Sequence, residues 1–197
     1  MTLVRVAKCF LFFVWICLGG ERLLGQGSFT IGFDDLPAPD WGGDPVPDNY
    51  LGLEWSNFYV YDLSHAGNPG YTVGIISQSN AVFNAYGYLA TLSSGSRFNL
   101  TSAYITGAFE DGILFEVRGF AGTDELYDKT YGLPGAAPEF IEFDFLDVDR
   151  VEFRSYGQYQ ANQFVMDDLT IAIPEPRSIA LLVLGVCCFT FRRKLRR

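Results

Sequence analysis

Apolar and polar residues alternate along several stretches in the middle of the chain, and this pattern constrains the fold most. In one such stretch Ile113, Phe115 and Val117 occupy every second position, and the alternation returns in residues 140–145 and 150–154. Successive side chains of a β-strand point to opposite faces, so the pattern predicts half-buried strands. Between residues 28 and 173 we find no apolar stripe with the period of a helix.

The predicted strands are short and follow one another closely. They are Phe29–Phe33, Leu53–Tyr61, Thr72–Ile76, Ala81–Asn84, Leu100–Phe109, Ile113–Phe120, Leu126–Tyr131, Phe140–Phe145, Val151–Ser155 and Phe164–Ile173. Turn-forming Gly, Asn, Asp, Ser and Pro residues separate them. We therefore predict an all-β domain over residues 28–173, an antiparallel β-sandwich that is jelly-roll-like.

The N-terminus has the three parts of a secretory signal peptide. Basic Arg5 and Lys8 precede a short apolar run, residues 9–18, and glycines follow this run. A membrane span needs about 20 apolar residues, more than this run supplies. We expect residues 1–27 to form a signal helix and to be removed after export; an uncleaved N-terminal anchor is the alternative.

The C-terminus carries a second terminal signal. Pro174, Glu175 and Pro176 end the last predicted strand, because proline has no N–H for a sheet ladder. An uncharged, mostly apolar segment, Ser178–Phe191, follows, and the tail 192–197 contains five basic residues. An apolar segment followed by Lys and Arg keeps the tail in the cytoplasm and the preceding domain outside.

This arrangement of Pro-Glu-Pro, a single apolar helix and a basic tail resembles the PEP-CTERM sorting signal of Gram-negative-type bacteria. In that family the signal is recognised by exosortase, a membrane-embedded cysteine transpeptidase-like enzyme. The resemblance covers residues 174–197. It implies exosortase as a partner, transient anchoring through a transmembrane helix at Ser178–Phe191, and a final location at the cell surface or in the extracellular matrix. The alternative is an ordinary C-terminal anchor with incidental prolines.

All four cysteines lie in the two terminal apolar segments, at positions 9, 17, 187 and 188. The domain between them has none. It therefore contains no disulfide framework, no thiolate nucleophile and no cysteine-ligated zinc.

The chain's formal net charge of −9 conceals a strong asymmetry. Residues 28–173 contain 5 basic residues against 21 acidic ones, which gives −16 for the domain alone. Such a domain repels nucleic acid and anionic membrane surfaces. A negative charge of this size suits a protein in a hydrated extracellular matrix or one that binds divalent cations. The alternative is that the charge only keeps the surface soluble.

Two acidic strand ends are candidate metal ligands. By alternation Asp35 shares the face of Phe33, and Asp167 shares the face of Val165 and Leu169, so both carboxylates are expected to point inward. A buried carboxylate must be hydrogen-bonded, paired or metal-bound. These strand ends resemble those of jelly-roll carbohydrate-binding modules, which implies one structural calcium ion at Asp35 and Asp167. Acids that merely cap turns are the alternative.

An aromatic-rich region, residues 41–61, contains the candidate ligand-binding residues Trp41 and Tyr50. Sugar rings stack on such side chains, whereas Trp55 and Phe58 are expected in the core. The Phe-Asp-Asp-Leu opening and the Tyr-x-Gly-Leu-x-Trp-x-Asn-Phe stretch resemble a group of uncharacterised exported PEP-CTERM proteins. That group implies no activity. We expect the ligand, where there is one, to be exopolysaccharide or another glycan.

Residues 142–147 resemble the Glu-x-Asp-x-x-Glu strand of retaining family-16-type glycosidases, with Glu142 and Asp144 on one face. Asp147 stands where that strand has a Glu, and alternating acids on a solvated strand face explain the pattern more simply. His65 is the single histidine, and the chain has no Gly-x-Ser-x-Gly elbow. We therefore predict no catalytic residues, with a secreted glycoside hydrolase using Glu142, Asp144 and Asp147 as the alternative to a structural or carbohydrate-binding surface protein.

Sorting is directly testable. The Ser178–Phe191 segment, about 14 residues at ~1.5 Å rise, is shorter than the ~30 Å hydrocarbon core, so it is a mismatched permanent anchor. We expect exosortase to remove it in the native host. Intact mass of the mature protein checks this, and a mass that still includes the tail 192–197 would contradict removal.

Overall fold

Antiparallel strands dominate the described part of the computed structural model, which comprises residues 27–37, 43–65, 69–109, 111–135, 137–157 and 162–173. The strands are β1 (Gly27–Ile31), β2 (Asp44–Pro45), β3 (Glu54–Ser56), β4 (Phe58–Asp62), β5 (Asn80–Asn84), β6 (Ala90–Gly107), β7 (Ile113–Ala121), β8 (Asp124–Leu133), β9 (Glu139–Tyr156) and β10 (Phe164–Ile173). Short helical turns lie between them: η1 (Tyr50–Gly52), η2 (Leu63–His65), α2 (Pro69–Val73) and η3 (Ala85–Gly87). This confirms the all-β, antiparallel prediction.

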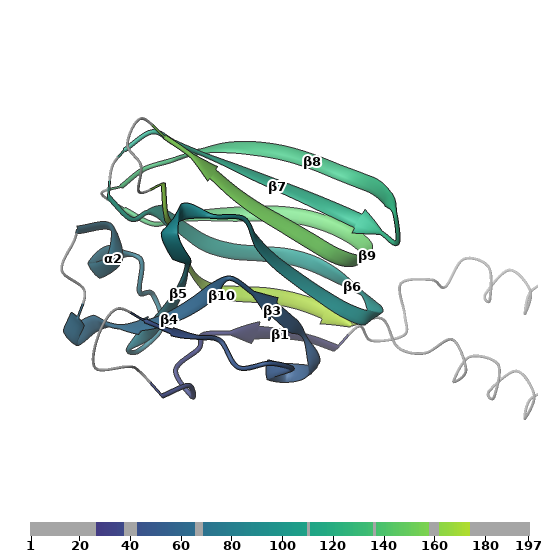
Figure 1. Cartoon of the computed structure of the whole chain (residues 1–197), viewed down its shortest axis with the longest axis horizontal. Helices are drawn as coiled ribbons and strands as arrows, with labels where there is room; N and C mark the ends of the chain where they lie inside the picture. Colours follow the sequence, from purple (N-terminus) through teal and green to yellow (C-terminus); the bar gives the residue numbers. More distant parts are fainter. Residues whose placement is uncertain are drawn as a thin grey trace, which may run out of the picture. The chain divides into compact units, whose positions relative to one another are not determined.

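The strands form one hydrogen-bonded sheet in the order β2-β4-β5-β10-β6-β9-β7-β8 (Figure 1). β1 pairs with β10 and β3 pairs with β6, outside this path. The sheet folds back on itself, because strands that are not neighbours in this order touch through their side chains. Phe115 of β7 and Phe164 of β10 have ring centroids 4.9 Å apart, although β6 and β9 lie between these strands in the order.

The two longest strands, β6 and β9, connect the two layers. The second half of β6 pairs with β10, and its first half pairs with β3. Likewise, the first half of β9 pairs only with β6, whereas its second half also pairs with β7. The layers enclose a core rich in fully buried phenylalanine: Phe33, Phe58, Phe98, Phe115, Phe143, Phe145, Phe153 and Phe164.

Two β-bulges bend β9 where it passes between the layers. Register with β6 slips between Leu100 and Ser102 and again between Phe98 and Leu100, where three residues of β9 oppose two of β6. Asp144 and Asp147 lie within these slips and have φ of 54° and 59°. Asp tolerates this left-handed conformation better than most residues do. The acids in this strand therefore have a backbone role.

The outer face of one layer is covered by residues 69–79, which include α2. Beneath them lies a second, smaller apolar cluster around Tyr61, Phe83 and Val165, with Tyr71 of α2 packed against it. The Tyr61 and Tyr71 rings meet edge to face at 4.7 Å, and the Tyr61 hydroxyl donates to the Tyr71 carbonyl at 2.8 Å. The predicted strand Thr72–Ile76 was therefore wrong, since part of it belongs to a covering helix.

Other boundaries also differ from the sequence prediction. The predicted strands at residues 140–145 and 151–155 are parts of the single strand β9, and β6 begins well before Leu100. Residues 53–61 divide into β3 and β4 at Asn57, whose φ is 58°. The expected signal and transmembrane helices lie outside the described residues. Among the described helices, none has the length and apolar character needed to cross a membrane.

The bulge at Asp144 yields a stability test. We expect Asp144→Val to lower the free energy of unfolding by about 1–2 kcal/mol, because a β-branched residue is strained at positive φ. Asp144→Gly is the matched control and should leave stability unchanged or raise it. Thermal melting of both variants measures the difference. Equal melting temperatures for the Val and Gly variants would show that backbone conformation does not select the residue here.

Candidate functional site

Of the two aromatic residues predicted to bind ligand, Trp41 lies outside the described residues and Tyr50 is half-buried in η1. The Tyr50 ring packs near Phe33 and Trp55, and its hydroxyl donates to Asp35 at 2.6 Å. Burial, together with the neighbouring Asp35, raises the pKa of Tyr50 well above its usual range. Tyr50 therefore borders the core, with its hydroxyl already engaged.

A different pair of aromatic side chains is presented to solvent. Tyr86 and Tyr88 are 72% and 68% exposed, more than any other large hydrophobic residue described. Their ring centroids lie 5.9 Å apart and the ring planes are inclined at 39°. Both belong to the link between β5 and β6. We call residues Ala85–Tyr88 the tyrosine turn.

The backbone of the tyrosine turn is strained. Tyr86 has φ 59° and ψ 12°, and Gly87 has φ 68°. The Tyr88 N–H donates to the Ala85 carbonyl at 3.1 Å, as in a type I′ turn, which favours Gly, Asn or Asp at its centre. A Cβ on Gly87 would lie 2.8 Å from the Asn162 carbonyl oxygen. A bulky residue in this conformation persists only where its surroundings impose it, and such strain is found at functional sites.

Two asparagines impose this conformation. The Asn57 side-chain nitrogen lies 3.1, 3.2 and 3.2 Å from the carbonyl oxygens of Ala85, Tyr88 and Leu89. The Asn84 side chain donates to the Tyr88 carbonyl at 3.0 Å and to the Ser155 hydroxyl at 3.1 Å. Its oxygen accepts from the backbone N–H of residue 164 at 2.8 Å. The turn is thus fixed to β9 and β10 and to the β3–β4 junction.

These contacts use the backbone of the turn and leave both tyrosine rings free. Exposed aromatic rings on a rigid turn offer apolar faces at low entropic cost. Such faces suit the C–H surface of a sugar ring. The sequence signal for this site is Asn-Ala-Tyr-Gly-Tyr at residues 84–88, where a glycine between two tyrosines follows a strand. This signal is easily missed because residues 41–61 contain more aromatic residues in total, six against two.

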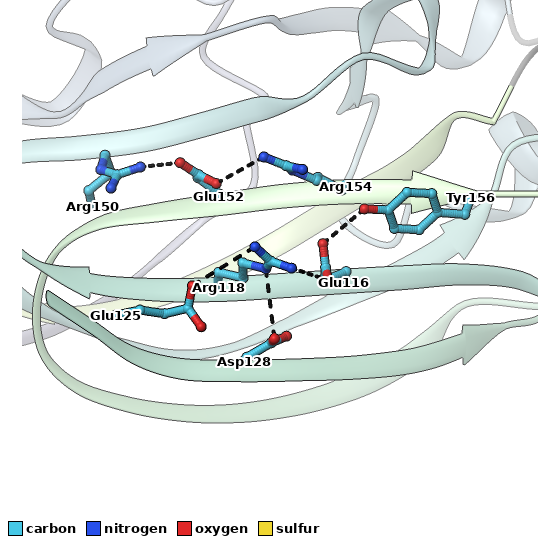
Figure 2. A network of polar contacts seen from close by, with 8 residues as sticks. All are labelled: Glu116, Arg118, Glu125, Asp128, Arg150, Glu152, Arg154 and Tyr156. Atoms are coloured by element: carbon cyan, nitrogen blue, oxygen red, sulfur yellow. Dashed lines mark hydrogen bonds and ion pairs between the residues drawn. The ribbon is translucent and has the colours of Figure 1, made fainter. Parts of the chain in front are cut away.

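A charged face covers the outer side of β7, β8 and the second half of β9 (Figure 2). Arg118 lies 2.8 Å from Glu116, 3.9 Å from Glu125 and 3.8 Å from Asp128. On β9, Glu152 pairs with both Arg150 and Arg154. Figure 2 also shows the Tyr156 hydroxyl donating to Glu116, at 3.0 Å. Partly exposed pairs of this kind contribute about 0–1 kcal/mol each.

Two buried or half-buried carboxylates anchor the segment that covers the other layer. Asp167 Oδ2 accepts from the N–H groups of Ile76 and Ser77 at 2.6 and 2.8 Å. Asp34 accepts from the next three N–H groups, those of residues 78, 79 and 80, at 3.2, 2.7 and 3.0 Å. Five consecutive backbone N–H groups are satisfied in this way. The acids at both strand ends therefore bind backbone.

The two predicted metal ligands differ from expectation. Asp35 is exposed, so its inward orientation was wrong; Asp34 is the residue turned toward the 76–80 segment. Asp167 is fully buried, as expected, but beneath residues 76 and 77 instead of in the main core. Asp168, with φ 49°, lies at a bulge in β10, which turns Leu169 to the face opposite Asp167.

These positions do not fit the calcium site that the sequence suggests. The Asp167 carboxylate is occupied by donors, namely the two N–H groups above, the Ser77 hydroxyl and the Asp168 N–H at 2.7 Å. The Asp35 carboxylate accepts from Tyr50 instead. Among the described residues no group of three acidic, His or Cys side chains could hold a metal ion. Calcium at Asp35 and Asp167 stays a prediction of the sequence.

The three acids of the glycosidase alternative lie on the exposed surface of β9. Glu142 and Asp144 do share a face, as expected. Asp147 lies in the next bulge, where its N–H donates to Asn99 at 2.9 Å and its carbonyl accepts from Arg97 at 2.7 Å. The positive φ of the two bulge positions explains why Asp stands at 144 and 147, and no catalytic role is needed.

Asp167 predicts a pH dependence. Burial raises the pKa of Asp167 to about 6, although its hydrogen bonds favour the charged form. A raised pKa in the folded state means that stability is highest below the unfolded pKa and is lost as pH rises through the folded pKa. Between pH 7 and about pH 4.5, we expect acidification to stabilise the protein by on the order of 2 kcal/mol through this group.

Melting temperature against pH measures this effect. Ser77→Ala is the comparison variant: it keeps the carboxylate but removes one donor that favours its charged form, so the pH dependence should stay or become steeper, whereas Asp167→Asn should reduce it. Asp34, whose pKa is lowered by its N–H donors against the effect of burial, loses its contribution only at lower pH. An identical slope in wild type and Asp167→Asn would contradict the assignment.

The chain has low similarity to several solved structures. No protein-family model and no curated protein matches the chain. TmCBM61 in complex with β-1,4-galactotriose is similar with a TM-score of 0.41 and 14% identity, covering 65% of this chain and 95% of that one. The K2 cleaved adhesin domain of Lys-gingipain has a TM-score of 0.45 and 14% identity, covering 75% and 100%. A family two carbohydrate esterase from Cellvibrio japonicus has a TM-score of 0.40 and 15% identity, covering 76% and 35%. At these scores and identities the likeness assigns neither a ligand nor an activity to this chain.

Proposed function

We propose that this protein is an exported glycan-binding protein of the cell surface or exopolysaccharide matrix, which binds carbohydrate through Tyr86 and Tyr88. The observation that carries the proposal is the tyrosine turn. Two strongly exposed rings stand on a backbone that is strained at Tyr86 and held by Asn57 and Asn84. Strain in a turn that the surrounding strands over-determine supports a functional role for the displayed side chains.

Binding without turnover agrees with the surroundings of the turn. The contacts that position it come from asparagine amides and a serine hydroxyl, which do not transfer protons readily near neutral pH. A stacking site of this kind needs only rigid apolar faces and a few polar neighbours. The proposal includes a jelly-roll relationship for the sandwich, in line with the sequence expectation.

Export and sorting belong to the same proposal and rest on the sequence. The signal at residues 1–27 would direct export, and exosortase would recognise Pro174, Glu175 and Pro176. The acidic domain would then occupy a hydrated extracellular environment. A glycan-binding turn on a sorted surface protein would attach exopolysaccharide to the cell.

A glycan array with the purified protein, followed by calorimetry on the strongest ligand, tests the function. We expect Tyr86→Ala and Tyr88→Ala each to weaken binding about tenfold or more, because an anchoring aromatic contributes ~1.4 kcal/mol or more. Phe140→Ala is the matched control, since Phe140 is an exposed aromatic on β9, 50% exposed. Glycan binding that survives both tyrosine substitutions, or no binding to any glycan, would overturn the proposal.

A further inference from the structure

We propose that the tyrosine turn selects uncharged glycans with a twisted chain, and that it excludes uronic-acid polymers and flat, crystalline chains. This inference rests on the proposed function and specifies the ligand class for the same site. Two independent observations carry it: the pairing of every basic side chain in the described part of the domain, and the angle between the two tyrosine rings.

Each of the five basic side chains in the described part of the domain already has a partner. Three of them, Arg118, Arg150 and Arg154, are paired with acids on the charged face. Arg97 lies 3.6 Å from Asp149 and donates to a backbone carbonyl. The Lys129 ammonium donates to the Phe143 carbonyl at 2.6 Å. A carboxylate ligand would have to compete with these partners for every cation.

The electrostatic field of the whole domain also disfavours anionic ligands. The 21 acidic residues against 5 basic ones in residues 28–173 give a formal charge of −16. A polyanion approaching this domain is repelled at long range, and the repulsion is strongest at low ionic strength. An uncharged polysaccharide does not experience this repulsion, and stacking on tyrosine requires no charge on the ligand.

Ring geometry restricts the shape of the chain. The Tyr86 and Tyr88 planes are inclined at 39° with centroids 5.9 Å apart. A flat ribbon such as a cellulose chain presents successive sugar faces in one plane, so it cannot lie parallel to both rings at once. A chain that rotates between successive sugars can. Asn57 and Asn84 fix the main chain that carries both tyrosines, and so fix where their two Cβ atoms lie. The rings contact each other at this inclination.

Binding of the purified protein to three probes tests the proposal: laminarin, a soluble twisted β-1,3-glucan; alginate, a uronic-acid polymer; and microcrystalline cellulose. We expect laminarin to bind at least about tenfold more tightly than alginate. The laminarin Kd should change less than about twofold between ~50 mM and ~500 mM NaCl, since screening has no ligand charge to act on. The Tyr86→Ala/Tyr88→Ala double variant should lose laminarin binding, and Phe140→Ala should retain it.

The outcomes separate this inference from the proposed function. Tyrosine-dependent binding of alginate that equals or exceeds laminarin binding would overturn the selection against charge and leave glycan binding intact. Tyrosine-dependent retention on cellulose above that on laminarin would overturn the selection for a twisted chain. If the double variant binds every probe as tightly as the wild type does, both proposals are overturned. If the wild type binds none of the three probes, the ligand class proposed here is overturned, and the glycan array decides the function itself.

Discussion

The antiparallel pairing of β6 with β9 is the interaction on which the rest of the structure depends. These two strands run through both layers. β3, β7 and β10 pair with one of them directly, and the remaining strands join the sheet through β7 or β10. A sheet buried on one face tolerates no slip of a single residue, since each slip would expose the apolar side chains. The two bulges in β9 let the same strand turn from one layer to the other while Phe143, Phe145 and Phe153 stay buried.

A second constraint is the set of hydrogen bonds that holds residues 76–80 over the opposite layer. Five consecutive backbone N–H groups in residues 76–80 point at carboxylates on Asp34 and Asp167. The N–H groups of residues 76, 77 and 80 are partly buried, and each would cost about 1–3 kcal/mol without an acceptor, so these acids stabilise an irregular segment. One acid lies near the start of the domain and the other in its last strand. They therefore also connect the two ends of the domain through the segment between them.

Much of the fold was predictable from alternation, whereas the placement of individual acids was not. Strand class and most strand centres followed from period-two patterns at Ile113, Phe115 and Val117 and at similar sites. Asp167 shows the limit of this argument. Alternation assigned it to the face of Leu169, and the bulge at Asp168 reversed that relationship. A bulge is fixed by pairing with a distant strand, so local sequence does not determine it. For the same reason the left-handed backbone conformation of Tyr86, which Asn57 helps to hold, was not visible in the sequence.

The hydrogen bonds that hold the tyrosine turn have a consequence for how the ligand specificity of such a protein can change. All hydrogen bonds from Asn57 and Asn84 to the turn end on main-chain carbonyls, and none engages the side chain at position 86 or 88. The hydrogen bonds thus fix the main chain of the turn and place no requirement on the side chains at positions 86 and 88. Residues at these two positions are open to exchange without rebuilding the frame, as in the hypervariable loops of binding proteins on a β-sandwich. Gly87 and the two asparagines would stay constant while paralogues acquire new ligands.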